Sequence, residues 1–363
     1  MAAALTDRSW TAAIGGPSTS DVDVATSVVL GERGARARTA GRAMGTQCAV
    51  MVVAADAEAA MAATREGWAL VELLDSLWSR FRPQSELSRL NAAASATREG
   101  TVSTGVDGLT STLVAAMRWA YGYSGGIVDA TVLDRVIAAG YDRDFDAVRR
   151  RDLELDRTVE GREVSPAAHP DLEAPFVSRM SEVTVDDRIV RRPAGVVLDS
   201  GGVGKGLAAD LIAAAAPARG FGGVLVDLGG DIRVIGDDLD GRPWRVGAAD
   251  ERVVEPGNLD RGGPLIVWRV TDGAVATSST ARRRWRGGHH IIDPRTGRPS
   301  TSDIAAVTVV ADTALAAETC AKTALVSGRR FAERWLPARC RAALITATDG
   351  AIHTYGDAGE WSR

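Results

Sequence analysis

The chain has few of the residues that mark metal-bound or disulfide-stapled domains. Its three cysteines, Cys48, Cys320 and Cys340, are widely separated and form no Cys-x-x-Cys pair. A zinc site and a disulfide framework are therefore not expected. Reduced thiols in a cytoplasmic protein are the simpler interpretation.

Long apolar runs and an excess of one charge are also missing. No stretch approaches the roughly 18 uncharged apolar residues that span a bilayer, and the N-terminus lacks the basic and apolar regions of a signal peptide. Lys and Arg total 43 against 47 Asp and Glu, so the sequence shows no basic stripe for nucleic acid. We expect a cytoplasmic protein without membrane insertion and without a nucleic-acid partner.

The distribution of apolar residues predicts a tail followed by one domain. Residues 1–36 are rich in small and polar residues and predict a disordered tail, with residues 37–363 forming a single domain. Short runs with β-branched residues predict strands, and helical spacing of apolar residues predicts helices. Strands in groups with helices between them indicate an α+β fold with mainly antiparallel sheets and flanking helices. The strands are expected at 47–53, 183–185, 195–198, 224–226, 264–270, 304–310 and 342–346, and the helices at 57–77, 108–122, 205–216, 314–327 and 330–335.

The strongest local signal is a glycine-rich turn between a predicted strand and a predicted helix. It contains Gly202, Gly204 and Lys205. Backbone N–H groups at glycines and at a helix N-terminus attract anions, and the lysine adds a full positive charge. The turn therefore predicts a phosphate site.

Two known phosphate motifs compete for this turn. Asp199 stands where a Walker loop requires glycine, so that motif fails. Gly204, Gly206 and Ala209 fit a dinucleotide fingerprint with Asp227 about 20 residues further on, so a nicotinamide dehydrogenase is an alternative. Against it, no repeated βαβ pattern precedes the turn, and a second glycine turn follows Asp227 at once.

A second polar segment, residues 276–299, combines hydroxyls, arginines and two of the four histidines. In alternating structure His289 and His290 point to opposite sides, so only one of them can face a site. A histidine beside hydroxyls and Asp293 suits proton transfer, although a structural histidine is an equally simple interpretation.

Taken in order, these segments resemble the ApbE family, the FAD:protein FMN transferases. The resemblance covers about residues 40–330. It rests on AMGT at 43–46, FRPQSELSRLN at 81–91, GGIVDATV at 125–132, LDSGGVGKGLAAD at 198–210, VDLGGDIRVIG at 226–236, VATSS at 275–279, HIIDPRTGRP at 290–299 and AETCAKTALV at 317–326.

The resemblance implies a fold related to T-fold proteins, with FAD in a cleft between two lobes. It also implies an Mg2+-dependent transferase that cuts FAD, attaches FMN to a Ser or Thr of a target flavoprotein and releases AMP. An FAD pyrophosphatase and a non-catalytic FAD-binding protein are alternatives on the same scaffold. The sequence does not identify the target or the oligomeric state.

The resemblance also assigns residues to the site. It implies catalytic roles for His290, Lys205 and Asp293. It implies a metal site at Gly202, Glu318 and the position of Lys322. The residues expected at the nucleotide are Met44, Gly45, Glu86, Ser88, Asn91, Asp129, Thr131, Gly202, Gly204, Lys205, Asp210, Gly229, Gly230, Asp231, Thr277, Ser278 and His290.

The sequence departs from the family pattern at three places. Thr277-Ser278-Ser279 replaces Thr-Ser-Gly, and Asp227 replaces the asparagine before the second glycine turn. Ala317-Glu318-x-x-x-Lys322 replaces Ala-Asp-x-x-x-Thr. The last pair is either a surface ion pair four residues apart on a helix or a weakened Mg2+ site. In the second case Lys322, which cannot ligate while protonated, partly replaces the ion as a point charge.

Overall fold

A large antiparallel sheet forms the centre of the molecule. The computed structural model describes residues 24–158, 172, 174–215, 221–249, 264–286, 288–357 and 359–361. Within these residues the sheet has nine strands, and each neighbouring pair runs antiparallel. Their spatial order is β1 (Ala25–Gly31), β2 (Gly34–Ala43), β3 (Thr46–Ala54), β7 (Gly223–Leu228), β8 (Asp231–Gly236), β11 (Asp272–Ser279), β16 (Ile304–Ala311), β17 (Ala342–Ala347) and β18 (Ile352–Gly356).

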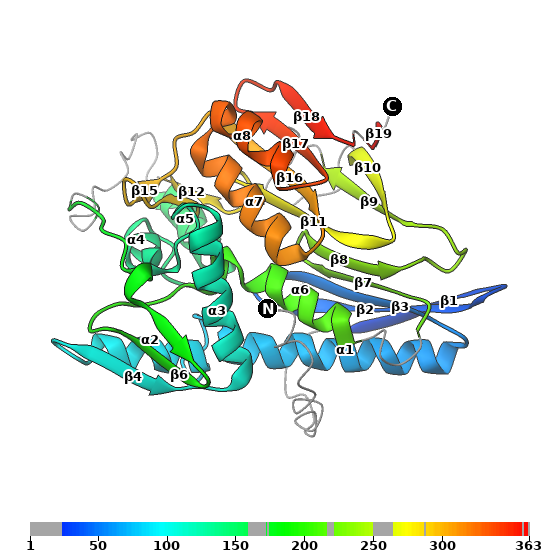
Figure 1. The fold of residues 1–363 in the computed structure, drawn as a ribbon, viewed down its shortest axis with the longest axis horizontal. Helices are drawn as coiled ribbons and strands as arrows, with labels where there is room; N and C mark the ends of the chain where they lie inside the picture. The colour runs from blue at the N-terminus through cyan, green and yellow to red at the C-terminus, as the bar shows by residue number, and fades with distance from the viewer. Residues whose placement is uncertain are drawn as a thin grey trace.

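Helices α1 (Ala57–Trp78), α6 (Gly204–Ala215) and α7 (Ala314–Ser327) cover one face of this sheet (Figure 1). Helix α1 begins where the Asp56 side chain accepts a hydrogen bond from the Ala59 N–H, as an N-cap does. Its buried residues, among them Trp68, Val71 and Leu74, recur at helical spacing. Helix α8 (Arg329–Trp335) and the turn η8 (Leu336–Ala338) follow α7.

A smaller sheet covers the opposite face. It contains β9 (Trp244–Ala249), β10 (Pro264–Val270) and β19 (Glu360–Trp361). Trp244, Ile266 and Trp268 of this sheet share a buried cluster with Val234 and Leu344 of the large one. The nine-stranded sheet therefore lies between apolar layers on both sides, as the predicted α+β class requires.

A second group of elements lies beside the sheet and its helices, on the left in Figure 1. It contains α2 (Glu86–Ser95), β4 (Thr101–Gly105), α3 (Gly108–Tyr123), η3 (Ala130–Val132), α4 (Leu133–Ala138), α5 (Phe145–Thr158), η5 (Met180–Glu182), β5 (Thr184–Asp186) and β6 (Ile189–Pro193). The turn η6 (Ser200–Gly202) joins it to α6. The short strands β12 (Arg284–Trp285), β13 (Gly288–His289), β14 (Ile292–Asp293) and β15 (Arg298–Pro299) form two two-stranded pairs after β11.

The antiparallel pairing confirms the predicted fold class and removes the dehydrogenase alternative. Strand β7, which follows the glycine turn and α6, pairs antiparallel with β3 and with β8. A dinucleotide fingerprint needs parallel strands around that turn. The fit of Gly204, Gly206 and Ala209 to the fingerprint is therefore a local coincidence.

Two sequence predictions about local structure need correction. Strand β1 lies inside the predicted tail, and residues 1–23 lie outside the described residues. Most β1 side chains are exposed, so no buried face marked the strand; its backbone pairs with β2 instead. Residues 195–198 form no strand, because the backbone groups of Leu198 bind the Asn91 side chain. The prediction of a single domain from residue 37 onward stays a prediction.

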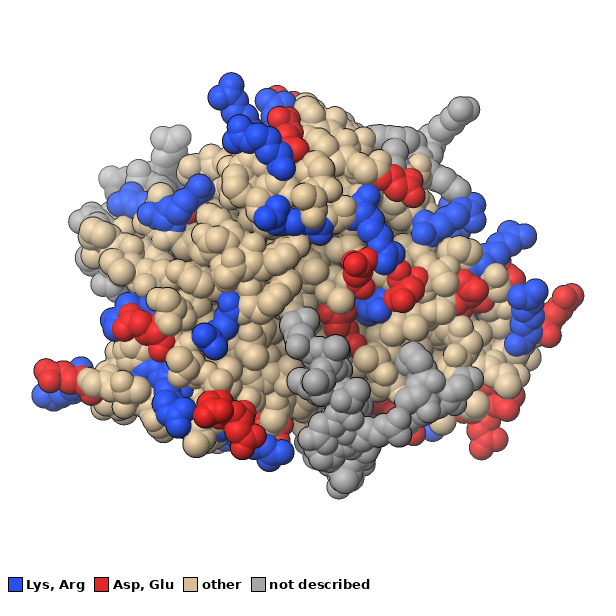
Figure 2. Space-filling model, viewed as in Figure 1, with Lys and Arg blue, Asp and Glu red and all other residues tan. Residues whose placement is uncertain are grey.

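The face of the molecule shown in Figure 2 carries both charge signs. Figure 2 shows Lys and Arg interspersed with Asp and Glu over the visible face, in keeping with the near-balanced composition. None of the described helices combines the length and apolar character needed to cross a bilayer.

Candidate active site

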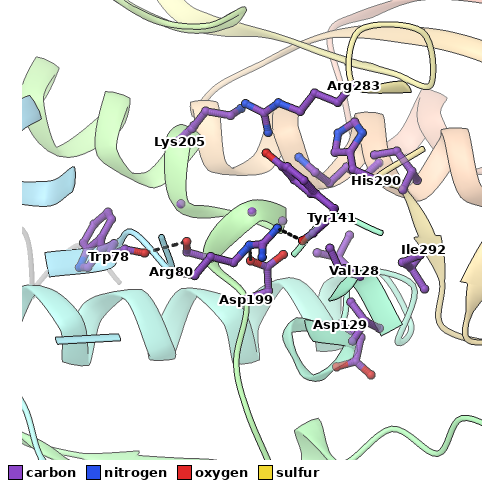
Figure 3. A pocket seen from close by; sticks show the side chains of 18 of the residues that line it. Trp78, Arg80, Val128, Asp129, Tyr141, Asp199, Lys205, Arg283, His290 and Ile292 are labelled. Carbon is purple, nitrogen blue, oxygen red and sulfur yellow. Dashed lines mark hydrogen bonds and ion pairs between the residues drawn. The ribbon is translucent and has the colours of Figure 1, made fainter. Parts of the chain in front are cut away.

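A pocket opens where the two groups of elements meet (Figure 3). As far as the described residues define it, its wall comes from the C-terminal end of α1, the segment before η3, the turn η6, the start of α6, the segment that contains His290, and α7. Met44, Asp129, Gly202, Gly204, Lys205, His290 and Lys322 line it, and all seven are among the residues predicted from the sequence.

The glycine turn enters the pocket because α6 packs very closely on α7. A Cβ atom on Gly206 would lie 2.6 Å from the carbonyl oxygen of Ala314 and 2.8 Å from Oε2 of Glu318, closer than side chains approach. Ser200 donates to the Trp78 carbonyl at 3.0 Å and fixes the turn to the end of α1. The start of α6 thereby lines the pocket with Gly204 and Lys205, at the helix N-terminus where a phosphate was predicted.

Lys205 reaches across this turn toward two buried carboxylates. Its ammonium forms an ion pair with Asp231 and lies 3.6 Å from Oε1 of Glu318. Burial lowers the pKa of Lys205 to about 8, and the charge of Glu318 opposes that shift. Asp231 is 1% exposed and lies behind the lysine, so the structure makes it a partner of Lys205 and not a wall residue.

Glu318 and Lys322 form the ion pair expected from their spacing, but the pair is buried. Lys322 Nζ lies 2.7 Å from Glu318 Oε1, and Glu318 is 0% exposed. The surface ion pair considered from the sequence is therefore wrong in its location. Burial opposes ionisation of Glu318, but Lys322 and Lys205 outweigh it and lower the pKa of the carboxyl.

His289 and His290 point to different sides, as alternation predicted. His289 is buried, and its Nε2 lies 3.0 Å from the Ser300 carbonyl oxygen. His290 lines the pocket, and its Nδ1 is buried without a hydrogen-bond partner. Burial first, and then the charges of Arg283 and Lys322, lower the pKa of His290 well below its usual value. The imidazole is therefore neutral at neutral pH and can accept a proton.

Met44 lies at the edge of the pocket in a strained backbone conformation. It has φ of +51°, and Gly45 after it has φ of +68°. Ala43 pairs with Thr46, so Met44 and Gly45 form a two-residue hairpin loop between β2 and β3, with positive φ at both positions as in a type I′ turn. Asp75 on α1 accepts a hydrogen bond from the Met44 N–H at 3.1 Å, and this contact holds the strained residue at the pocket.

Sequence reasoning missed a stacked arginine in the floor of the pocket. The Arg80 guanidinium lies 4.1 Å from the ring centroid of Phe81 and 4.5 Å from that of Tyr141. Its Nη2 donates to the Tyr141 carbonyl at 2.9 Å, and its Nε lies 3.4 Å from Asp199 (Figure 3). Asp199 lies inside the LDSGG segment, and Arg80 immediately precedes FRPQ. Their positions within and next to two family motifs could have identified them as pocket residues.

Several predicted nucleotide residues lie outside this pocket and make structural contacts instead. Glu86 accepts from the Asp107 N–H at 2.8 Å, and Ser88 donates to the Ser79 carbonyl at 3.4 Å. Both carboxylate oxygens of Asp210 accept from the first N–H groups of α7, at 2.8 and 2.9 Å, and thereby cap that helix.

The remaining predicted residues make contacts that hold the segments next to the pocket in place. Thr131 binds Asp129, whose other oxygen is buried without a partner. The Gly230 N–H donates to Asp227 at 2.8 Å, and a Cβ on Gly229 would collide with Thr46. The Thr277 hydroxyl binds that of Thr308 at 2.9 Å, and Ser278 is buried in β11.

Asp293 does not face His290 across the pocket. Its carboxylate forms an ion pair of 2.8 Å with Arg295 and accepts from the Arg295 N–H at 2.9 Å. Asp293 therefore closes the turn that its Asp-Pro sequence predicted. We assign it no part in proton transfer.

The comparisons with known proteins agree with this geometry. The ApbE family model matches residues 44–345. The FAD:protein FMN transferase of Treponema pallidum is 30% identical over 82% of this chain and 82% of its own length, and that of Klebsiella pneumoniae is 29% identical over 77% and 75%.

Solved structures agree in fold. The flavin transferase ApbE from Vibrio cholerae superposes with a TM-score of 0.67 at 23% identity and covers 93% of this chain and 98% of its own. The ApbE protein of Thermotoga maritima gives 0.65 at 22% identity, with 92% and 97% covered. Since the family model spans most of the sequence and a relative at 30% identity covers four fifths of it, the chain belongs to the ApbE family.

Proposed function

We propose that this protein is an FAD:protein FMN transferase. A Ser or Thr hydroxyl of a target flavoprotein attacks the flavin-side phosphorus of FAD. The new P–O bond joins FMN to the target, the P–O bond to the AMP half breaks, and AMP leaves. The observation that carries the proposal is that one pocket contains a helix-terminal glycine turn, two lysine ammonium groups and a histidine whose pKa is lowered and whose Nδ1 is buried without a partner.

The glycine turn and Lys205 would hold the diphosphate of FAD. Cleavage of a diphosphate depends mainly on positioning and on stabilising oxygen charge. The N-terminal end of α6 and the ammonium of Lys205 would supply both, with the Gly206 N–H already bound to Glu318. The buried Asp231 holds Lys205 in place from behind.

His290 would take the proton of the attacking hydroxyl. A general base must be unprotonated at the operating pH, and burial keeps this imidazole neutral. Its Nδ1 has no partner within the described residues, so the ring is not committed to a structural hydrogen bond. His289, whose Nε2 meets the Ser300 carbonyl, is committed to one.

An FAD pyrophosphatase is the second candidate, because water in place of the target hydroxyl gives free FMN and AMP from the same pocket. A non-catalytic FAD-binding protein is the third, and the uncommitted His290 argues against it. The cytoplasmic location and a cytoplasmic flavoprotein target stay predictions.

Product analysis separates the three candidates. The protein is incubated with FAD and a flavoprotein that carries an accessible Ser or Thr acceptor, and the nucleotides are separated by chromatography. The transferase releases AMP in a one-to-one ratio with flavin bound covalently to the acceptor. Free FMN that appears with AMP when acceptor is present indicates the pyrophosphatase. Intact FAD with no AMP rules out both reactions.

A further inference from the structure

The two lysines of this chain are both in the pocket. The sequence of 363 residues contains lysine only at positions 205 and 322, and all the other residues in its total of 43 Lys and Arg are arginine. The Lys205 and Lys322 side chains are 17% and 15% exposed and line the cavity. A compact ammonium is therefore used only here, where two cations approach one carboxylate.

Both oxygens of the Glu318 carboxylate that they share already have partners within the protein. Oε1 of Glu318 is 2.7 Å from Lys322 Nζ and 3.6 Å from Lys205 Nζ, and Oε2 accepts from the Gly206 N–H at 2.8 Å. The residues that the structure describes contain no group of three His, Cys, Asp or Glu side chains able to hold a metal. Mg2+ takes hard oxygen ligands, and a protonated lysine offers no lone pair. The residues present do not fit the ion that the family resemblance implies.

The charges are layered in depth. The carboxylates of Glu318 and Asp231 are 0% and 1% exposed and lie behind the lysines. Lys205 and Lys322 line the pocket in front of them together with Arg283, and the aspartates of the lining, Asp75, Asp129 and Asp199, belong to other segments of its wall. At this part of the wall a ligand therefore meets the ammonium groups before the buried carboxylates, which hold them in position.

We propose that Lys322, held by Glu318 beside Lys205, is a built-in cation that binds the diphosphate of a dinucleotide substrate in place of a divalent metal ion. The proposal rests on the transferase function above. It assigns to Lys322 the positioning of the diphosphate and the neutralisation of its charge, whereas a protonated lysine would be unfavourable next to a bound Mg2+. The ligand class is an organic diphosphate, with FAD as the case the proposed function supplies.

Binding without metal is the first test. FAD affinity is measured by flavin fluorescence, in EDTA and in excess Mg2+, for the wild type and for Lys322→Met. The wild type binds equally well in both, and Lys322→Met binds about tenfold or more weakly in EDTA. Loss of wild-type binding in EDTA, or unchanged affinity in the variant, overturns the proposal.

Two further variants guard against misfolding. Lys322→Met leaves the buried Glu318 with one cation fewer, so the double variant Glu318→Gln with Lys322→Met removes both charges of the pair together. It should melt near the wild-type temperature and still bind FAD weakly. Arg334→Met removes one exposed positive charge on α8, outside the pocket, and should leave affinity unchanged. Equal weakening by Arg334→Met would show a general charge effect and overturn the proposal.

Amine labelling tests for the contact between Lys322 and the bound diphosphate without any substitution. Because Lys205 and Lys322 carry the only side-chain amines, acetic anhydride labelling followed by peptide mass spectrometry reports on these two groups. FAD in EDTA should protect Lys322, and inorganic pyrophosphate should protect it as well. Labelling of Lys322 that neither ligand reduces overturns the proposal.

The two ideas fail separately. Metal-free FAD binding with protection of Lys322, but without FMN transfer, leaves the built-in cation standing and removes the transferase function. FMN transfer that requires Mg2+, with Lys322 unprotected from labelling, supports the transferase function and overturns the built-in cation.

Discussion

Asn91 donates a hydrogen bond to the Leu198 carbonyl and accepts one from the Leu198 N–H, both at 2.8 Å. The contact joins α2 to the residue immediately before Asp199 and the glycine turn. The resemblance placed Asn91 near the nucleotide, but its amide is satisfied at both ends. Asn91 therefore positions the turn that binds phosphate and does not itself bind the ligand.

Removal of this contact should disturb the turn. Asn91→Ala leaves two backbone groups of Leu198 without partners, which costs about 1 to 3 kcal/mol of unfolding free energy. It should also weaken FAD binding, because the glycine turn loses its support. Urea denaturation and FAD titration measure the two effects. Ser95→Ala, at an exposed position on the same helix, is the control and should change neither. A variant as stable as wild type would show that Leu198 is held by other contacts.

The two histidines should separate activity from stability. His290→Asn removes the base and should lower the rate of FMN transfer by roughly 10² to 10⁴, with FAD binding largely kept. His289→Asn removes the contact with Ser300 and should lower the melting temperature with a much smaller effect on the rate. Single-turnover transfer assays and thermal melts distinguish them. Equal loss of rate in both variants contradicts the assignment of His290.

The pKa of His290 also makes a prediction about stability and pH. Burial lowers the pKa in the folded state, so the unfolded chain binds a proton below about pH 6.5 that the folded protein excludes. The stability linked to His290 is fully present above that pH and is lost as the pH falls.

Comparison with His290→Asn isolates this linkage, because the other titrating groups are common to both proteins. From about pH 7.5 to about pH 5, the unfolding free energy of the wild type should fall relative to the variant. The difference should grow below pH 6.5 by up to about 1.4 kcal/mol per pH unit. Chemical denaturation across this range measures it. Parallel curves would mean that His290 titrates as an ordinary exposed histidine.

Arg80 should depend on its planar guanidinium and not on charge alone. Its guanidinium lies over the rings of both Phe81 and Tyr141 and donates to the Tyr141 carbonyl. Arg80→Lys keeps the charge but loses the stack and the fork of donors. We expect a loss of about 1 to 2 kcal/mol of unfolding free energy. Arg82→Lys, on an exposed side chain that pairs with Asp75, should cost less. An unchanged unfolding free energy in Arg80→Lys would show that the positive charge alone accounts for the contribution of this side chain to stability.

The part of the site that is local in sequence could be predicted. Gly202, Gly204 and Lys205 lie in one turn. The alternation of His289 and His290 predicted that only one of them faces a site, and the family resemblance indicated His290. Their positions follow from backbone geometry over a few residues. The apolar spacing of α1 and α3 likewise gave their bounds to within one residue.

The parts that depend on distant contacts could not be predicted. The spacing of Glu318 and Lys322 predicted an ion pair, but its burial depends on α6, which is more than 100 residues earlier in the chain. Asp210 looked like a ligand residue because it ends the glycine motif, yet it caps α7. Strand β1 was missed because its side chains are mostly exposed, and a strand held by backbone pairing leaves no apolar pattern in the sequence.

The mass of the acceptor protein tests the central claim most directly. An acceptor flavoprotein is incubated with FAD and this protein, and its intact mass is measured before and after. The account predicts a gain of one FMN on the acceptor. The gain should be lost when the acceptor Ser or Thr is replaced by Ala or when His290→Asn replaces the wild type. An unchanged acceptor mass while AMP and free FMN accumulate would contradict the account.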